Sequence, residues 1–135
     1  MIRSKICFVA EGVVRDAETN SVSVFNILEG VAAVGFPFFM QKLGFFALWE
    51  REAADGAETQ GIFTAAIGNE QLSTVNLNIN FGDKFRHRTI VNINGLVVPH
   101  VGDLHFRVQL AGGPVAEYIV NVTALPAVVQ VQNPA

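Results

Sequence analysis

The stretch that decides the fold is Thr74-Val75-Asn76-Leu77-Asn78-Ile79-Asn80-Phe81, in which polar and apolar residues alternate without a break. Successive side chains of a β-strand point to opposite faces of the sheet. The four apolar residues therefore share one face, and Thr74 shares the other with three asparagines. This pattern predicts a strand that is buried on one face and exposed on the other.

Segments of similar character lie on both sides of this strand. Residues 104–110 repeat the alternation and residues 115–123 follow after a Gly-Gly-Pro turn, which predicts a C-terminal hairpin. Residues 5–14 and 22–28 are rich in β-branched and aromatic residues and are separated by a polar turn, which predicts an N-terminal hairpin. Further strands are expected at 43–50, which is apolar on both faces, 61–67 and 89–98.

The spacing of these segments indicates the fold class. Short strands without helical periodicity between them are typical of antiparallel sheets rather than of parallel α/β sheets. The sequence therefore predicts an all-β fold, an antiparallel β-sandwich of seven to eight strands that is immunoglobulin-like or similar. A single domain is expected to span residues 1–135. Within it, an extended tail at residues 126–135 is one alternative.

The composition is apolar for a chain of 135 residues. Charged residues make up 16% of it, against about 25% in an average soluble domain, and the mean hydropathy is +0.37. The formal net charge of −3 argues against nucleic acid as a partner. The apolar run 6–10 is short for a secretion signal, and polar residues interrupt 118–135, so we expect no signal peptide, no membrane span and a cytoplasmic location.

The order of several motifs resembles that of a bacterial family, of about this chain length, that is known only as a domain of unknown function. The resemblance covers most of the chain and implies a β-sandwich, but it implies no activity, cofactor or partner. It rests on an N-terminal strand that runs into Ala10-Glu11-Gly12-Val13-Val14-Arg15, a short strand that ends in the Ile-Leu-Glu-Gly turn at 27–30, Phe36-Pro37, the apolar strand at 43–50, and Gly102-Asp103-Leu104-His105-Phe106-Arg107 with the hairpin after it.

The sequence lacks the motifs of common enzyme classes. None of its 12 glycines forms a Gly-x-Gly pair, and no serine is flanked by glycines as in a nucleophile elbow. Cys7, the single cysteine, lies between Ile6 and Phe8 and is expected to be a buried thiol. We therefore expect no cofactor and no enzymatic activity, and an enzyme with unfamiliar geometry is the least favoured class.

The best candidates for metal ligands are His100, Asp103 and His105. Asp103 and His105 are two residues apart on a predicted strand and so project to one side, with His100 in the preceding turn. A solvated turn beside an exposed strand face explains the same residues, and we favour that interpretation over a metal site.

Two polar groups of residues suggest other ligands. A basic cluster around Phe85 could contact an anion, although the lack of a wider basic stripe favours a solvated turn. A set of asparagines could form a neutral face for a carbohydrate or a protein, but we favour simple solvation. These residues are Lys84, Arg86, His87 and Arg88 in the cluster, and Asn76, Asn78, Asn80, Asn92 and Asn94 in the face.

Two apolar segments are candidates for an interface. The first surrounds Pro37 and lies outside regular strand alternation, so it either plugs the core or contacts a partner. The second lies in the uncharged tail, which either adds a strand to a neighbour or docks on its own domain. The candidate residues are Phe36, Phe38, Phe39 and Met40 in the first segment and Val128, Val129 and Val131 in the second.

These observations favour a non-catalytic protein that self-associates, or binds another protein, as a structural or adaptor subunit. A module that binds a carbohydrate or another small molecule is the alternative.

Overall fold

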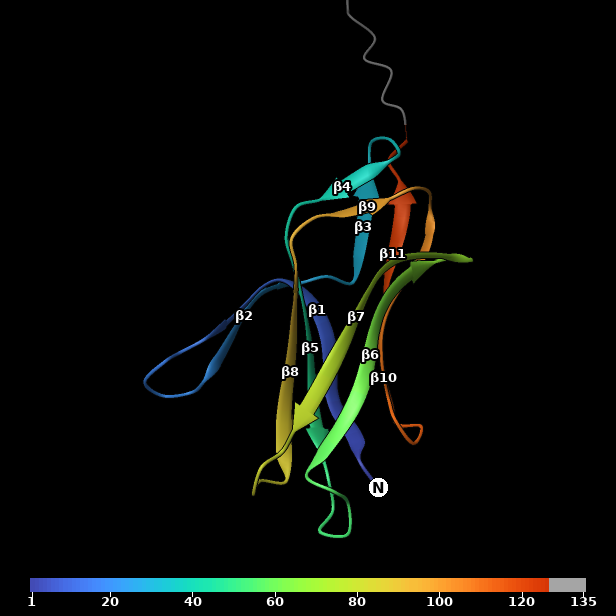
Figure 1. The fold of residues 1–135 in the computed structure, drawn as a ribbon. Coiled ribbons are helices and arrows are strands. Elements are labelled where there is room, and N and C mark those ends of the chain that lie inside the picture. The colour runs from blue at the N-terminus through green and yellow to red at the C-terminus, as the bar shows by residue number, and fades with distance from the viewer. Residues whose placement is uncertain (127–135) are drawn as a thin grey trace, which may run out of the picture.

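The computed structural model describes residues 1–126 of the 135, and every regular element in that part is a β-strand (Figure 1). The eleven strands are β1 (Arg3–Arg15), β2 (Val22–Ile27), β3 (Gly30–Ala33), β4 (Phe38–Met40), β5 (Leu43–Glu50), β6 (Glu58–Ile67), β7 (Glu70–Asn80), β8 (Arg86–Ile93), β9 (Leu96–Val98), β10 (Gly102–Leu110) and β11 (Val115–Ala124).

The strands form two larger sheets and a small ribbon. The first sheet has the order β2-β1-β5-β8 and is antiparallel throughout. The second has the order β3-β11-β10-β6-β7, in which β3 runs parallel to β11 and the other pairs are antiparallel. The antiparallel ribbon of β4 and β9 lies at the end of the molecule where β3 and β11 terminate (Figure 1).

The core lies between the facing sides of the two larger sheets. Phe45 and Trp49 of β5 point into it from the first sheet, and Phe63 of β6 and Phe106 of β10 point into it from the second; all four are fully buried. The rings of Phe45 and Phe63 bridge the sheets, with centroids 5.2 Å apart. Alternate residues of β5 point to the other face, where Phe46 stacks on Phe8 of β1 at 4.9 Å.

The hairpin of β1 and β2 projects from the sandwich (Figure 1). β1 pairs with β5 only as far as Ala10, opposite Gly44, and then continues with β2 alone. The Asp16 carboxylate accepts hydrogen bonds from backbone N–H groups of the hairpin turn, and Asn20 in that turn has a left-handed φ of 61°. The turn reaches β8, where Arg88 Nη1 donates to the Asn20 carbonyl at 2.6 Å.

The predicted fold class is confirmed: the chain is all-β, with sheets packed as in a sandwich. Both predicted hairpins exist, as the pairs β1–β2 and β10–β11, and the strand predicted at 43–50 coincides with β5. Residues 1–126 contain no helix with the length and apolar character that a membrane span needs.

The expected number of seven to eight strands is wrong, because eleven lie within residues 1–126. β3, β4 and β9 are only three or four residues long, which is too short for alternation to reveal them. The strand expected at 89–98 is divided into β8 and β9 by Gly95, whose φ of 102° is incompatible with a continuous strand. The sheets are also not purely antiparallel, since β3 pairs in parallel with β11.

The segment around Pro37 does not alternate in polarity, but it contains a short strand. Phe38, Phe39 and Met40 form β4 and pair with Val98, Val97 and Leu96 of β9. Pro37 directly precedes β4 and therefore removes no hydrogen-bond donor from that pairing.

Candidate functional site

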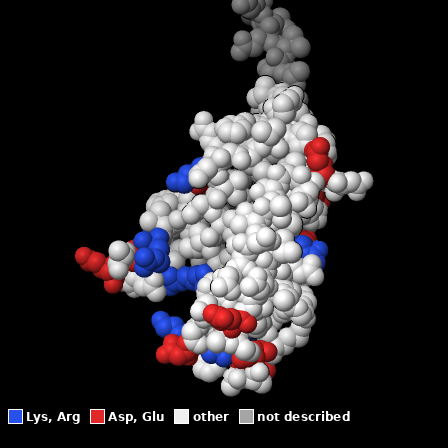
Figure 2. Space-filling view, in the orientation of Figure 1, with Lys and Arg blue, Asp and Glu red and all other residues white. Residues whose placement is uncertain are grey.

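One end of the described molecule carries no formal charge. This uncharged end consists of residues 30–41, 94–102 and 121–126, which contain no Asp, Glu, Lys or Arg. The three segments are joined by the pairings of β3 with β11 and of β4 with β9. Figure 2 shows the corresponding end of the space-filling view as white, with the Lys, Arg, Asp and Glu side chains lying farther down.

The uncharged end exposes large apolar side chains. Phe39 of β4 and Val97 of β9 are cross-strand partners and are 57% and 52% exposed. A β-carbon on Gly95 would lie only 3.1 Å from the Phe39 ring, so the ring rests directly against this glycine. Val34 and Leu125 are exposed on the neighbouring strand ends. Large exposed apolar side chains on paired strands are a feature of interaction sites.

The interface candidates around Pro37 separate into two groups. Met40 belongs to the buried core, and Phe36 and Phe38 are half-buried and pack against it. Phe39 points outward. The segment therefore contributes both to the core and to the surface. The tail candidates Val128, Val129 and Val131 lie outside the described residues.

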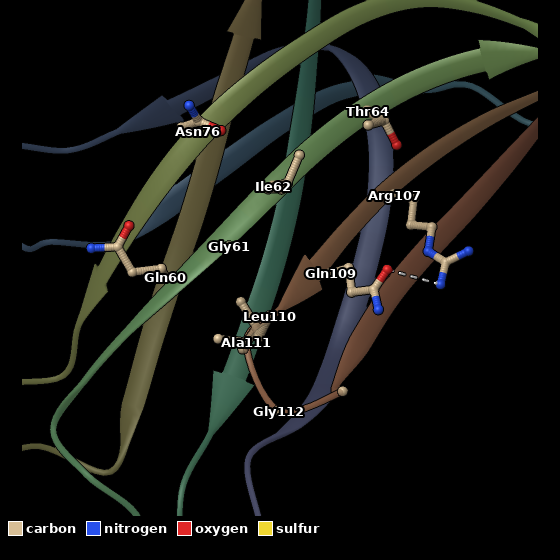
Figure 3. A pocket seen from close by; sticks show the side chains of 11 residues that line it. Gln60, Gly61, Ile62, Thr64, Asn76, Arg107, Gln109, Leu110, Ala111 and Gly112 are labelled. Atoms are coloured by element: carbon tan, nitrogen blue, oxygen red, sulfur yellow. Dashed lines mark hydrogen bonds between the residues drawn. The ribbon is translucent and has the colours of Figure 1, made fainter.

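A groove lies on the outer face of the second sheet, and apolar residues line more of it than polar ones; we call it the polar groove after its five polar side chains (Figure 3). Its volume is about 790 Å³, and β6, β7, β10 and the β10–β11 turn line it. Arg107 Nη2 donates to Gln109 Oε1 at 3.4 Å, while the buried Nε of Arg107 has no hydrogen-bond partner among residues 1–126. The polar side chains at this groove are Gln60, Thr64, Asn76, Arg107 and Gln109. Sequence analysis missed this groove, because its residues come from strands whose register is set by the fold.

The five asparagines do not form one face. Asn76, Asn78 and Asn80 are exposed along β7 in the second sheet. Asn92 lies on β8 in the first sheet, and Asn94 lies in the turn before β9. The expectation of a common face is therefore wrong, because β7 and β8 are successive in sequence but belong to different sheets.

The metal-ligand candidates make separate contacts. Asp103 accepts a hydrogen bond from Asn121 Nδ2 at 3.0 Å, and His105 Nδ1 lies 3.2 Å from Glu117 Oε1. His100 Nδ1 contacts the carbonyl of the adjacent Val101. Across residues 1–126, no three His, Cys, Asp or Glu side chains are grouped so that they could hold a metal ion.

Two groups with potential reactivity are held in unreactive states. Cys7 is partly buried against the core, and desolvation raises the pKa of its thiol to about 12, so the thiol is protonated at neutral pH. Glu50 lies between Arg3 Nη2 at 2.8 Å and Arg86 Nε at 3.3 Å. The hydrogen bond from Arg3 lowers the pKa of Glu50, which keeps it an ionised ion-pair partner rather than a proton donor.

The predicted basic cluster lines a cleft. Lys84, Arg86 and Arg88 face the β1–β2 hairpin, which contributes Arg15 and Asn20 to the same cleft of about 700 Å³. Phe85 does not enter the cleft lining and instead packs on the Arg51 guanidinium, with Cζ 4.8 Å from the ring centroid. Sequence analysis missed Arg15 and Asn20, since nothing in the sequence shows that the hairpin turn reaches β8.

Together these features define a β-sandwich protein with two open grooves and one uncharged end. The chain belongs to DUF6941, a family of unknown function, whose family model matches residues 5–123. The matched region contains β2 to β10 completely, together with most of β1 and β11. None of the curated proteins compared with the chain matches it.

Proposed function

We propose that the protein is a non-catalytic structural or adaptor subunit that self-associates through its uncharged end. The observation that carries this proposal is the cross-strand pair of Phe39 and Val97, both more than half exposed on segments that contain no charged residues. Burying the exposed part of one Phe39 ring contributes roughly 1 to 1.5 kcal/mol, and a symmetric contact gains this twice.

Charge favours a second copy of the chain as the partner. In a two-fold symmetric contact the same patch is present on both partners, so a patch with a net charge meets a patch of the same net charge. The uncharged end avoids this repulsion, whereas the rest of the molecule carries a net charge of −3. Residues 127–135, which follow Leu125 and Pro126 in the sequence, also contain no Asp, Glu, Lys or Arg.

The test compares two phenylalanines of equal exposure. Phe39 is 57% exposed at the uncharged end, and Phe25 is 56% exposed on β2 of the hairpin. We expect Phe39→Ser to convert the oligomer to a monomer in size-exclusion chromatography with light scattering, while Phe25→Ser leaves the mass unchanged. If both variants are monomers, or if both keep the mass of the wild type, the uncharged end is not the interface.

A second candidate function is the binding of a carbohydrate or another neutral small molecule in the polar groove. The polar side chains of the groove support it, because Gln60, Asn76 and Gln109 supply amide groups and Arg107 supplies a guanidinium group. Amide and guanidinium groups on one concave surface match the donors and acceptors of sugar hydroxyls. We expect a neutral sugar that binds here to raise the melting temperature of the wild type but not of Arg107→Gln. A sugar that stabilises both proteins equally would place its site elsewhere.

The strand order supports a further proposal, an immunoglobulin-like sandwich. In that fold one sheet contains strands A, B and E as neighbours and the other contains C, F and G. β1-β5-β8 follows the first order and β6-β10-β11 follows the second, with β7 added at the edge beside β6. An experimental structure whose sheets connect in another order would contradict this assignment.

A further inference from the structure

The cleft between the β1–β2 hairpin and β8 combines a basic rim with an apolar floor. Arg15 comes from the hairpin, Lys84 from the β7–β8 turn, and Arg86 and Arg88 from the outer face of β8. No Asp or Glu is among the residues that line the cleft. Figure 2 shows Lys and Arg side chains gathered on the side of the molecule from which the hairpin projects.

Two guanidinium groups of the rim meet at one amide. Arg15 Nη1 lies 3.3 Å and Arg88 Nη1 lies 3.5 Å from the same Asn20 Oδ1, and Arg88 also donates to the Asn20 carbonyl. Each guanidinium has five N–H donors, so most remain available to a ligand. An anion bound at this place would lower the mutual repulsion of the two guanidinium groups.

The positive charge of the rim is only partly compensated. Arg86 forms an ion pair with Glu50 at 3.3 Å. By contrast, in the part of the chain that the structure covers, Arg15, Lys84 and Arg88 have no carboxylate within ion-pair distance. Asp16, the acidic residue next to Arg15, is bound to the backbone of its own turn.

The floor of the cleft is apolar. Phe46 and Leu48 of β5 and Ile90 of β8 face outward from the first sheet, beneath the rim. Phe46 and Ile90 are direct cross-strand neighbours, as are Leu48 and Arg88, so the apolar surface adjoins a guanidinium. A volume of about 700 Å³ is in the range of sites for small organic molecules.

We infer that this cleft binds a small organic anion, a phosphate or carboxylate group attached to an apolar body. The anionic group lies between Arg15 and Arg88, where two guanidinium groups give charge-assisted hydrogen bonds. The apolar body covers Leu48 and Ile90. This site is independent of the proposed self-association, because the cleft and the uncharged end share no residue.

Isothermal titration with phenyl phosphate, inorganic phosphate and phenol tests both halves of the inference. We expect phenyl phosphate to bind at least about tenfold more tightly than inorganic phosphate, because its ring buries the apolar floor, and phenol not to bind. Arg15→Gln and Arg88→Gln each weaken phenyl phosphate binding by about tenfold or more. Arg15→Gln is the safer variant for folding, because Arg88 rather than Arg15 holds the hairpin to β8. An unchanged melting temperature verifies that each variant is folded.

Arg107→Gln is the matched control, because it removes one arginine from the groove of the other sheet. The inference fails if Arg107→Gln weakens binding as much as Arg15→Gln does, or if phenyl phosphate does not bind. It also fails if inorganic phosphate binds as tightly as phenyl phosphate, since the floor then plays no part. Sedimentation with vesicles of anionic lipid, combined with no binding of phenyl phosphate, would instead indicate a membrane surface as the ligand.

Discussion

Thr89 is the only polar residue buried within residues 1–126, and its hydroxyl group explains why Trp49 can be fully buried. The Trp49 indole N–H donates to Thr89 Oγ1 at 3.2 Å, so the indole keeps a hydrogen bond inside the core. His87 Nδ1 lies 3.4 Å from the same hydroxyl. His87 is half-buried, and desolvation lowers its pKa.

The lowered pKa of His87 makes stability depend on pH. The unfolded chain binds a proton on His87 near the ordinary pKa of 6.5, and the folded protein does so only at lower pH. The stabilisation is therefore complete above pH 6.5 and is lost as the pH falls through 6.5 toward the folded pKa. We expect the urea midpoint to fall between neutral pH and about pH 5, and this fall to be smaller in His87→Gln.

Between neutral pH and about pH 5, the change in stability comes from His87 rather than from the carboxylates with lowered pKa values. Asp16, Glu50 and Asp55 have ordinary values of 3.8, 4.5 and 3.8, so their stabilising contributions are lost only in more acidic solution. A wild-type protein whose midpoint is constant from neutral pH to about pH 5 would refute the role given to His87.

At the scale of elements, β3 joins the two sheets. It follows β2 of the first sheet directly in sequence and pairs in parallel with β11 of the second. The Tyr118 hydroxyl of β11 donates to the Leu28 carbonyl just before β3 at 2.7 Å. After β3, the Leu125 N–H donates to the Ala33 carbonyl at 2.8 Å. The short strand is thus fixed at both ends.

Removing the Tyr118 hydroxyl tests this anchor. We expect Tyr118→Phe to lower the free energy of unfolding by about 1 kcal/mol, because it leaves the Leu28 carbonyl without this donor. Hydrogen exchange at the amides of β3 should become faster. Thr123→Val is the control, since its exposed hydroxyl donates to the Val31 carbonyl at 3.5 Å and contributes little. Urea unfolding of both variants measures the difference, and a Tyr118→Phe protein as stable as the wild type would contradict the anchor.

The comparison of sequence with structure also belongs to this scale. The long strands, such as β7 and β10, were predictable because their alternation extends over many residues. β3 and β4 were not predictable, because each pairs with a strand more than 50 positions away and is too short for a pattern. For the cleft, Arg86 and Arg88 were visible as a basic cluster, whereas Arg15 joins them only through the reach of the hairpin.

At the scale of the whole molecule, the two proposed interaction surfaces are separated. The uncharged end contains β3, β4, β9 and the end of β11, and the basic cleft lies on the outer face of the first sheet beside the hairpin. Contact through the uncharged end depends on apolar burial, which added salt does not weaken. Anion binding in the cleft depends on charge and is weakened by salt. Ionic strength therefore distinguishes the two proposed interactions.

The central claim is that the uncharged end joins two copies of the chain, and the absolute mass in solution tests it most directly. We expect light scattering over a range of micromolar concentrations to give at least twice the chain mass of 14.6 kDa, both at low salt and in about 1 M NaCl. A mass of 14.6 kDa at every concentration would contradict the claim.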